Sequence, residues 1–271
     1  MKITCANGFR GSGSPGLKMA GFLIIWGVGL ALLGGCADQG WNIGKNILGA
    51  RQQLAPVTAQ AAATLFPLKP TTGQFRIVEG DDAGDDFHFS LTPDVKGWKF
   101  TYDQRQVTYL QPAADGALLI TREDALDDGV AVTYTPPIVA LPANLTPRVP
   151  FKGQCQAVIR NLDDHSEVTR GSCRYQVELL GMQKVTTPAG TFKAAIVRVH
   201  RGLNLGMADV TVDILTAYVP GRGQIAERVD QTTVALGLFP VRDLTETRLD
   251  KPEGGHQRAT THPAGSRKGS K

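Results

Sequence analysis

Much of this chain consists of stretches in which apolar and polar residues alternate, with turn residues between them. The alternation is clearest over residues 155–159, 173–179 and 208–218. Because successive side chains of a strand point to opposite faces, this period of two predicts strands with one buried face. Further strands are predicted at 74–79, 87–91, 98–102, 117–123, 130–134, from 192 onward, and at 224–229, 232–238 and 241–249. The pattern favours a mainly β protein with an antiparallel sheet.

Proline and glycine divide these stretches. Thr187-Pro-Ala-Gly190 and Pro220-Gly221 combine proline with a residue that tolerates a left-handed conformation, so each is expected to be a tight turn between strands. Five prolines fall between 136 and 150, and proline cannot donate a ladder hydrogen bond. We therefore expect residues 136–150 to cross between strands without pairing as a central strand.

The start of the chain has a different pattern. An uncharged apolar run, Met19–Leu33, follows Lys2, Arg10 and Lys18 and has the length of a signal-peptide core. Gly34-Gly35-Cys36 at its end resembles a bacterial lipobox, which implies cleavage before Cys36 and lipidation of its sulfur; Ala37, in place of Asp, implies the outer membrane. An uncleaved transmembrane anchor is the alternative. Two or three acyl chains attach a protein stably to a bilayer.

Composition changes along the chain and suggests four parts: a signal peptide (1–35), a lipidated tether (36–66), an antiparallel β domain (67–250) and a disordered basic tail (251–271). Residues 46–54 and 57–65 could form short helices within the tether, which we expect to dock partly on the sheet. The formal charge of +4 belongs to the two ends, because residues 36–250 hold 21 basic and 24 acidic side chains. This distribution argues against nucleic-acid binding.

Two of the four cysteines, Cys155 and Cys173, remain in the predicted β domain. If their strands form a hairpin with the two cysteines opposite each other, both apolar sets face the same side. Export to an oxidising compartment makes a disulfide between them the expected state.

A longer pattern resembles uncharacterised secreted or periplasmic bacterial β-proteins. It comprises Val185–Ala194, the strand after it, then Tyr218–Gly223, with Phe66-Pro67-Leu68 near the start; Gln224 departs from the apolar residue usual there. The resemblance implies a curved antiparallel sheet or half-barrel, broadly similar to periplasmic carriers of lipidated or apolar cargo. It implies no catalytic residues.

Candidate catalytic and metal-binding groups are few. Ser166 beside His165 and Asp164 lies in a predicted turn and outside any Gly-x-Ser-x-Gly motif, and His200 is expected at the rim of a strand. The acidic residues 81–86 with His88 could bind a hard cation, but they match no EF-hand spacing. We therefore expect a non-enzymatic protein without metal or cofactor.

The remaining candidate site is the apolar face of the sheet. We expect it to bind a lipid or lipidated cargo in the periplasm, with the alternative that the protein assembles with another cell-envelope protein. The predicted ligand-binding residues are Trp98, Phe100, Tyr102, Tyr134, Tyr175, Val212 and Ile214.

Overall fold

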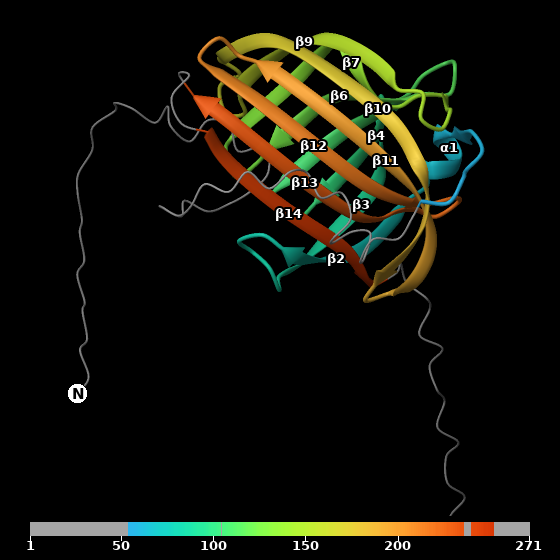
Figure 1. The fold of residues 1–271 in the computed structure, drawn as a ribbon. Helices are drawn as coiled ribbons and strands as arrows, with labels where there is room; N and C mark the ends of the chain where they lie inside the picture. The colour runs from blue at the N-terminus through green and yellow to red at the C-terminus, as the bar shows by residue number, and fades with distance from the viewer. Residues whose placement is uncertain (1–53, 104, 236–239, 252–271) are drawn as a thin grey trace, which may run out of the picture.

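Twelve antiparallel strands close into a single barrel in the computed structural model, which describes residues 54–103, 105–235 and 240–251 (Figure 1). Around the barrel the order is β10-β11-β12-β13-β14-β2-β3-β4-β5-β6-β7-β9, and β9 pairs with β10 to complete the circle. The barrel strands are β2 (Thr71–Glu79), β3 (Asp86–Asp94), β4 (Gly97–Tyr102), β5 (Gln106–Pro112), β6 (Leu118–Ala125), β7 (Val130–Leu141), β9 (Phe151–Asn161), β10 (Glu167–Thr187), β11 (Gly190–Asn204), β12 (Ala208–Val219), β13 (Gly223–Ala235) and β14 (Pro240–Lys251).

The prediction of a mainly β, antiparallel protein is confirmed, whereas the predicted curved sheet or half-barrel is corrected to a fully closed barrel. The difference lies in two pairings: β7 with β9, across the segment that contains β8, and β14 with β2, which lie near opposite ends of the described chain. Leu249 of β14 lies opposite Phe75 of β2, and Val132 of β7 lies opposite Ile159 of β9. These pairings leave the large sheet without a free edge, so its apolar face becomes the interior of a barrel.

The predicted hairpin register around the two cysteines is confirmed. Cys155 of β9 and Cys173 of β10 are direct cross-strand partners, and both are buried. The alternating apolar residues beside them on each strand are buried as well. Here the period of two was sufficient to fix the pairing.

Two strand predictions are corrected. The proline-rich crossing does not begin at residue 136, because β7 continues through Pro136 and Pro137 to Leu141 and still pairs with β6. Pairing with β9 ends at Thr135, and the register with β6 shifts between Thr133 and Ile138, so the two prolines lie in an irregular part of the strand that pairs with neither neighbour. The strands predicted at 224–229 and 232–238 are a single strand, β13, since no turn residue interrupts them.

The described part of the tether docks on the end of the barrel. It contains β1 (Gln60–Ala61), which pairs with β8 (Asn144–Leu145), and α1 (Ala62–Leu65), one short turn in place of the helix predicted at 57–65 (Figure 1). Leu65 is fully buried, and Ala55 forms a bridge with Met182 of β10. Residues 46–53 of the helix predicted at 46–54, the signal peptide, Cys36 and residues 252–271 lie outside the described residues.

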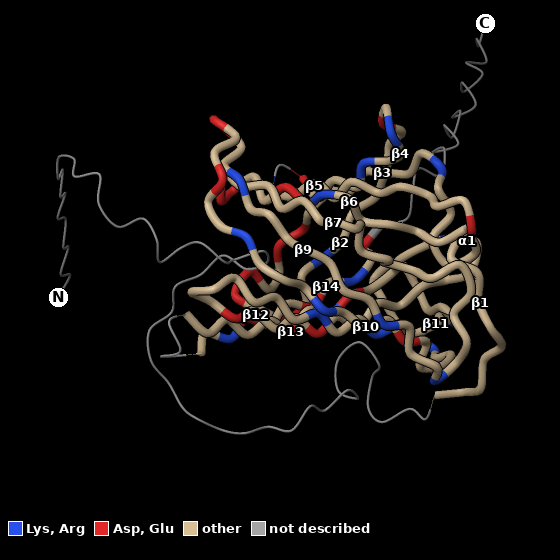
Figure 2. Tube along the Cα trace, turned by 90° about the horizontal axis from the view of Figure 1, so that it is seen from above, with Lys and Arg blue, Asp and Glu red and all other residues tan. Residues whose placement is uncertain are grey.

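The barrel is apolar inside and charged outside. Phe75, Phe87 and Phe89 pack against one another in the interior, with ring centroids 4.7 to 5.7 Å apart. Acidic and basic positions lie near one another along β10, β12, β13 and β14 (Figure 2). Where the chain is described, no helix has both the length and the apolar character needed to cross a membrane.

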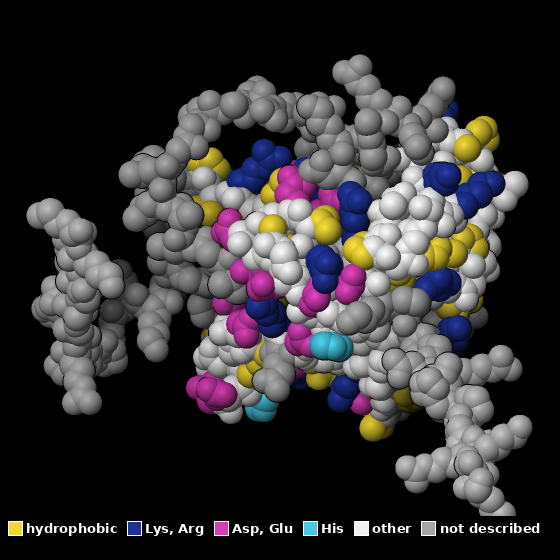
Figure 3. All heavy atoms as spheres, turned by 90° about the horizontal axis from the view of Figure 1, so that it is seen from below, with side chains coloured by type: hydrophobic (Ala, Val, Ile, Leu, Met, Phe, Trp, Pro, Cys, Tyr) yellow, Lys and Arg dark blue, Asp and Glu magenta, His cyan; other side chains and the backbone are white. Residues whose placement is uncertain are grey.

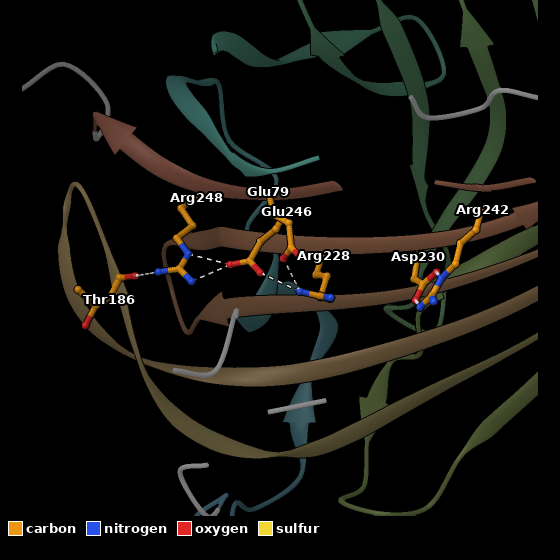
Figure 4. A network of polar contacts seen from close by, with 7 residues as sticks. All are labelled: Glu79, Thr186, Arg228, Asp230, Arg242, Glu246 and Arg248. Carbon is orange, nitrogen blue, oxygen red and sulfur yellow. Dashed lines mark hydrogen bonds and ion pairs between the residues drawn. The ribbon is translucent and has the colours of Figure 1, made fainter. Parts of the chain in front are cut away.

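A network of ion pairs links β13, β14 and β2 on the barrel wall (Figure 4). Glu246 of β14 is fully buried and lies 2.7 Å from Arg248 and 3.3 Å from Arg228 of β13; Arg228 also lies 2.7 Å from Glu79 of β2. Burial raises the pKa of Glu246, and its two arginines oppose that effect. The network holds β13, β14 and β2 together at the place where the sheet closes.

Candidate functional site

The barrel interior contains a cavity of about 130 Å³ between β4–β7 on one side and β11–β13 on the other. Much of its wall is apolar and includes Phe66, Leu110, Leu118, Ile120, Ile138, Leu141, Val199, Leu203, Val210 and Val212. A few polar and ionisable side chains face it, among them Glu123, Arg201 and Glu227. An apolar cavity with a few convergent polar groups is the usual form of a small-ligand site.

An ion pair crosses the interior. Glu123 of β6 accepts a hydrogen bond from Arg201 Nη1 of β11 at 3.1 Å and one from the Tyr134 hydroxyl of β7 at 2.5 Å. The side chains of Arg201 and Glu123 are only 10% and 8% exposed, so this pair is almost fully desolvated. Burial lowers the pKa of Arg201, but the surrounding groups, Glu123 first, outweigh it and hold that pKa above its ordinary value. The pair is therefore charged and internally neutral.

Glu227 of β13 is the second carboxylate on the cavity wall. Thr216, its direct cross-strand neighbour on β12, donates a hydroxyl hydrogen bond to its Oε2 at 3.2 Å. No arginine, lysine or histidine lies within ion-pair distance of Glu227 in the described part of the chain. Burial raises the pKa of Glu227 to about 7, with a smaller contribution in the same direction from Glu123. Thr216 and, at longer range, Arg201 oppose this increase, so an ionised Glu227 is a negative charge on the cavity wall without a direct counter-ion among the described residues.

Four aromatic rings line the same part of the cavity. Phe66 follows α1, Phe100 and Tyr102 belong to β4, and Tyr218 belongs to β12. The ring centroid of Phe66 lies 5.8 Å from that of Phe100 and 6.3 Å from that of Tyr218, both edge to face. The centroids of Phe100 and Tyr102 are 4.6 Å apart.

The negative charge of Glu227 contributes to the raised pKa of both tyrosines, Tyr102 and Tyr218, for which burial is the larger cause. The carboxylate and the rings therefore share one environment. We call the four rings with Glu227 the aromatic box.

The structure separates the predicted ligand-binding residues into two groups. The five that line the cavity are Phe100, Tyr102, Tyr134, Val212 and Ile214. Tyr175 instead lies against Gly153 of β9, where a Cβ would come within 2.2 Å of its ring, and its hydroxyl accepts a hydrogen bond from the Val139 N–H at 3.0 Å. Trp98 packs at the margin of the core and is absent from the cavity wall. Ligand binding by these residues stays a prediction.

Sequence reasoning missed Glu123, Arg201 and Glu227. Each lies at an inward position of its strand. With the register known, the alternation of inward and outward positions would have identified them as charged residues that face the interior. Charged residues at inward positions depart from the apolar pattern, and such departures are typical of functional or strained sites.

The other candidate groups lie elsewhere. Asp164 accepts hydrogen bonds from the Ser166 backbone N–H at 2.9 Å and from the Ser166 hydroxyl at 2.7 Å, which is a turn geometry. Among the described residues, Asp164 therefore binds the serine and does not orient a histidine, as a catalytic triad would require. Asp82 of the acidic turn pairs with Arg105 at 3.1 Å, and His200 pairs with Asp213 at 2.9 Å while half exposed. Where the chain is described, no group of three or more His, Cys, Asp or Glu residues could hold a metal ion.

Cys155 and Cys173 are free thiols in the structure, so the expected disulfide is not formed there. The neighbouring Cys173 sulfur, together with burial, raises the pKa of the Cys155 thiol. The pair lies in the barrel wall, where the charges of Arg201 and Glu123 also act on the pKa of both thiols.

Neither the protein-family models nor the curated proteins compared with this chain give a match. A solved structure does align, that of a "putative lipoprotein" from Parabacteroides distasonis ATCC 8503. It is 13% identical, with a TM-score of 0.35, and the alignment covers 70% of this chain and 99% of that chain. Neither the identity nor the TM-score is high enough to transfer a function.

Proposed function

We propose that this protein is a lipid-anchored barrel of the bacterial cell envelope that binds an apolar ligand in its interior. The observation that carries this proposal is the cavity of about 130 Å³ inside the closed barrel, whose largely apolar wall includes two carboxylates and an arginine. Buried charges are costly to place inside a fold, so their position on a cavity wall rather than on the water-facing surface favours a role in binding.

The cavity size limits the ligand. An engineered cavity of about 150 Å³ in another protein holds one benzene molecule, whereas sites for drug-sized ligands measure about 300 Å³ or more. A complete lipid would therefore require the barrel to open further. The ligand that fits without rearrangement is a small amphipathic molecule, or one end of a larger one.

The proposed anchor rests on the sequence. Gly34-Gly35-Cys36 follows the apolar run at the position of a cleavage site, and the described tether begins at residue 54, leaving about twenty residues between Cys36 and the barrel. Lipid on Cys36 would place the barrel at a bilayer surface, where the outer membrane is the proposed location. The charged outer wall suits a barrel that faces water.

Native mass spectrometry of the full chain, extracted from membranes in mild detergent, tests the binding proposal. A bound small molecule, released on unfolding, is the expected result. The matched variant is Val212→Phe, which fills the cavity from β12 and should abolish the additional mass. Val229→Ile, on a buried residue that does not itself line the cavity, should retain it. Identical spectra without ligand for all three proteins would contradict the proposal.

A role in assembly with an envelope protein remains the alternative. Apart from Val149 and Phe151, which are close in sequence, the exposed large hydrophobic residues come from separate parts of the described chain: Val78, Val95, Leu126, Met207 and Val241. On the face shown in Figure 3, hydrophobic side chains lie in small groups among charged ones. Scattered apolar residues are normal on a protein surface and do not by themselves indicate a partner.

The disulfide between Cys155 and Cys173 is retained as a proposal for the exported protein. Their direct cross-strand register is the geometry that such a bond requires, and an oxidising compartment favours it. Mass spectrometry after thiol alkylation, with and without reductant, distinguishes the two states. Alkylation of both cysteines in unreduced, unfolded protein would refute it.

A further inference from the structure

The part of the cavity around Glu227 has a chemistry that the apolar wall does not explain. Its carboxylate faces the cavity with the Thr216 hydroxyl as its hydrogen-bond partner and with no cationic side chain within ion-pair distance among the described residues. An ionised carboxylate in such a place is strongly destabilised unless a counter-charge reaches it. Arg201 opposes the raised pKa of Glu227 only from beyond ion-pair distance, because its guanidinium pairs with Glu123 at 3.1 Å.

The rings beside Glu227 are suited to the same kind of ligand. Aromatic faces attract cations, and cages of several rings are a recurring way to bind substituted ammonium groups. Phe66, Phe100, Tyr102 and Tyr218 line the cavity together, and neighbouring centroids are 4.6 to 6.3 Å apart. The rings contact one another edge to face, and all four border the cavity.

We infer that the aromatic box binds a small organic ammonium ion, whose positive charge pairs with Glu227 while its methyl or methylene groups contact the rings. This inference rests on the proposed function and specifies the polar head of the ligand. The charge balance of the cavity supports it. With Glu123 and Arg201 paired, an ionised Glu227 leaves one net negative charge, which one ammonium group neutralises. A carboxylate-bearing ligand would instead add to that charge.

The size agrees with the same class of ligand. A cavity of about 130 Å³ takes a molecule on the order of six to eight non-hydrogen atoms. Trimethylammonium compounds such as choline fall in this range. Choline also has a neutral isostere, 3,3-dimethyl-1-butanol, in which a carbon atom replaces the nitrogen, so the pair isolates the effect of the charge.

The test is calorimetric titration of the full chain, in mild detergent at pH 8, with choline and with 3,3-dimethyl-1-butanol. Choline should bind at least about ten-fold more tightly, the gain of one desolvated cation–π contact or ion pair. Glu227→Gln should reduce the affinity for choline to that of the alcohol and leave the alcohol unaffected. Glu178→Gln, on β10 and away from the cavity wall, is the control and should change neither affinity.

Ring and charge contributions can be separated. Tyr218→Phe keeps the aromatic face and should retain choline binding. Tyr218→Leu should reduce the affinity for choline more than the affinity for the alcohol. Choline binding should also weaken when pH falls from 8 to 5.5, since Glu227 becomes protonated and choline does not titrate. The other groups that act on Glu227 are Arg201, Glu123, Tyr102 and Tyr218, and the alcohol serves as the reference for changes in them.

The ammonium group could be free or part of a lipid head. Short-chain phosphatidylcholine and phosphatidylglycerol share their acyl chains and phosphodiester and differ in the ammonium group. Preferential, Glu227-dependent binding of the phosphatidylcholine would assign the site to a lipid head, and binding of choline alone would assign it to a soluble ion.

Two outcomes overturn the inference. Equal affinity for choline and the alcohol would reject it while leaving an apolar ligand site in place. Absence of binding by both compounds, together with ligand-free native mass spectra, would reject the proposed function as well.

Discussion

Glu227 should make the stability of the barrel depend on pH in a way that one substitution removes. Its pKa is raised from 4.5 to about 7 in the fold, with burial as the main cause and Glu123 acting in the same direction, against Thr216 and Arg201. Because the folded pKa lies above the unfolded one, the folded state holds this proton more tightly. The stabilisation is present in full below about pH 4.5 and is lost as pH rises through about 7.

The magnitude follows from the same values. Each pKa unit between the folded and unfolded states corresponds to about 1.4 kcal/mol, so raising the pKa from 4.5 to about 7 gives about 3 kcal/mol. Glu227→Gln has no such titration, and its side-chain oxygen can still accept the Thr216 hydrogen bond. The unfolding free energy of the variant relative to the wild type should therefore increase by about 3 kcal/mol between pH 4.5 and pH 8.

Urea unfolding of both proteins, followed by circular dichroism at half-unit pH intervals, measures this difference. Taking the difference removes the titration of all other groups, including Arg201, Tyr102 and Tyr218. Glu178→Gln is the matched control and should show a flat difference across the same range. A flat difference for Glu227→Gln would refute the reasoning, because it would mean that the carboxylate is solvated when ionised.

Three further predictions concern the cavity, the buried ion pair and the anchor. Val212→Phe should lower the free energy of unfolding in urea by less than about 1 kcal/mol, because the ring fills the cavity, whereas Val229→Phe in the packed wall should lower it by about 1–3 kcal/mol. Equal losses in the two variants would argue against the cavity. Glu123→Leu should destabilise by about 3–5 kcal/mol because it leaves Arg201 charged and buried, and adding Arg201→Met should restore most of the loss; no recovery in thermal unfolding would contradict this. Cys36→Ser should abolish lipid attachment, seen as loss of the acylated N-terminal peptide in mass spectrometry; an unchanged peptide mass in both proteins would exclude lipidation.

The alternation of apolar and polar residues predicted many of the strands that form the barrel wall. The alternation around Cys155 and Cys173 predicted the correct register, because a shift of one residue would have turned both apolar sets outward. The same reasoning placed five cavity-lining residues on one face, Tyr134 and Val212 among them. It failed at Pro136, because the two prolines are accommodated in a local register shift and the strand resumes its pairing with β6 at Ile138.

The sequence by itself determined that this is a mainly β protein and which residues alternate along its strands. It also contains an N-terminal segment with the features of a lipidated export signal. Tertiary structure decided that the sheet closes, since β2 and β14 meet only when the intervening strands have curved through a full circle. It also brought Glu123 next to Arg201, 78 residues away. Alternation reports which face a side chain takes, whereas closure and the charges facing each other across the cavity depend on contacts between distant strands.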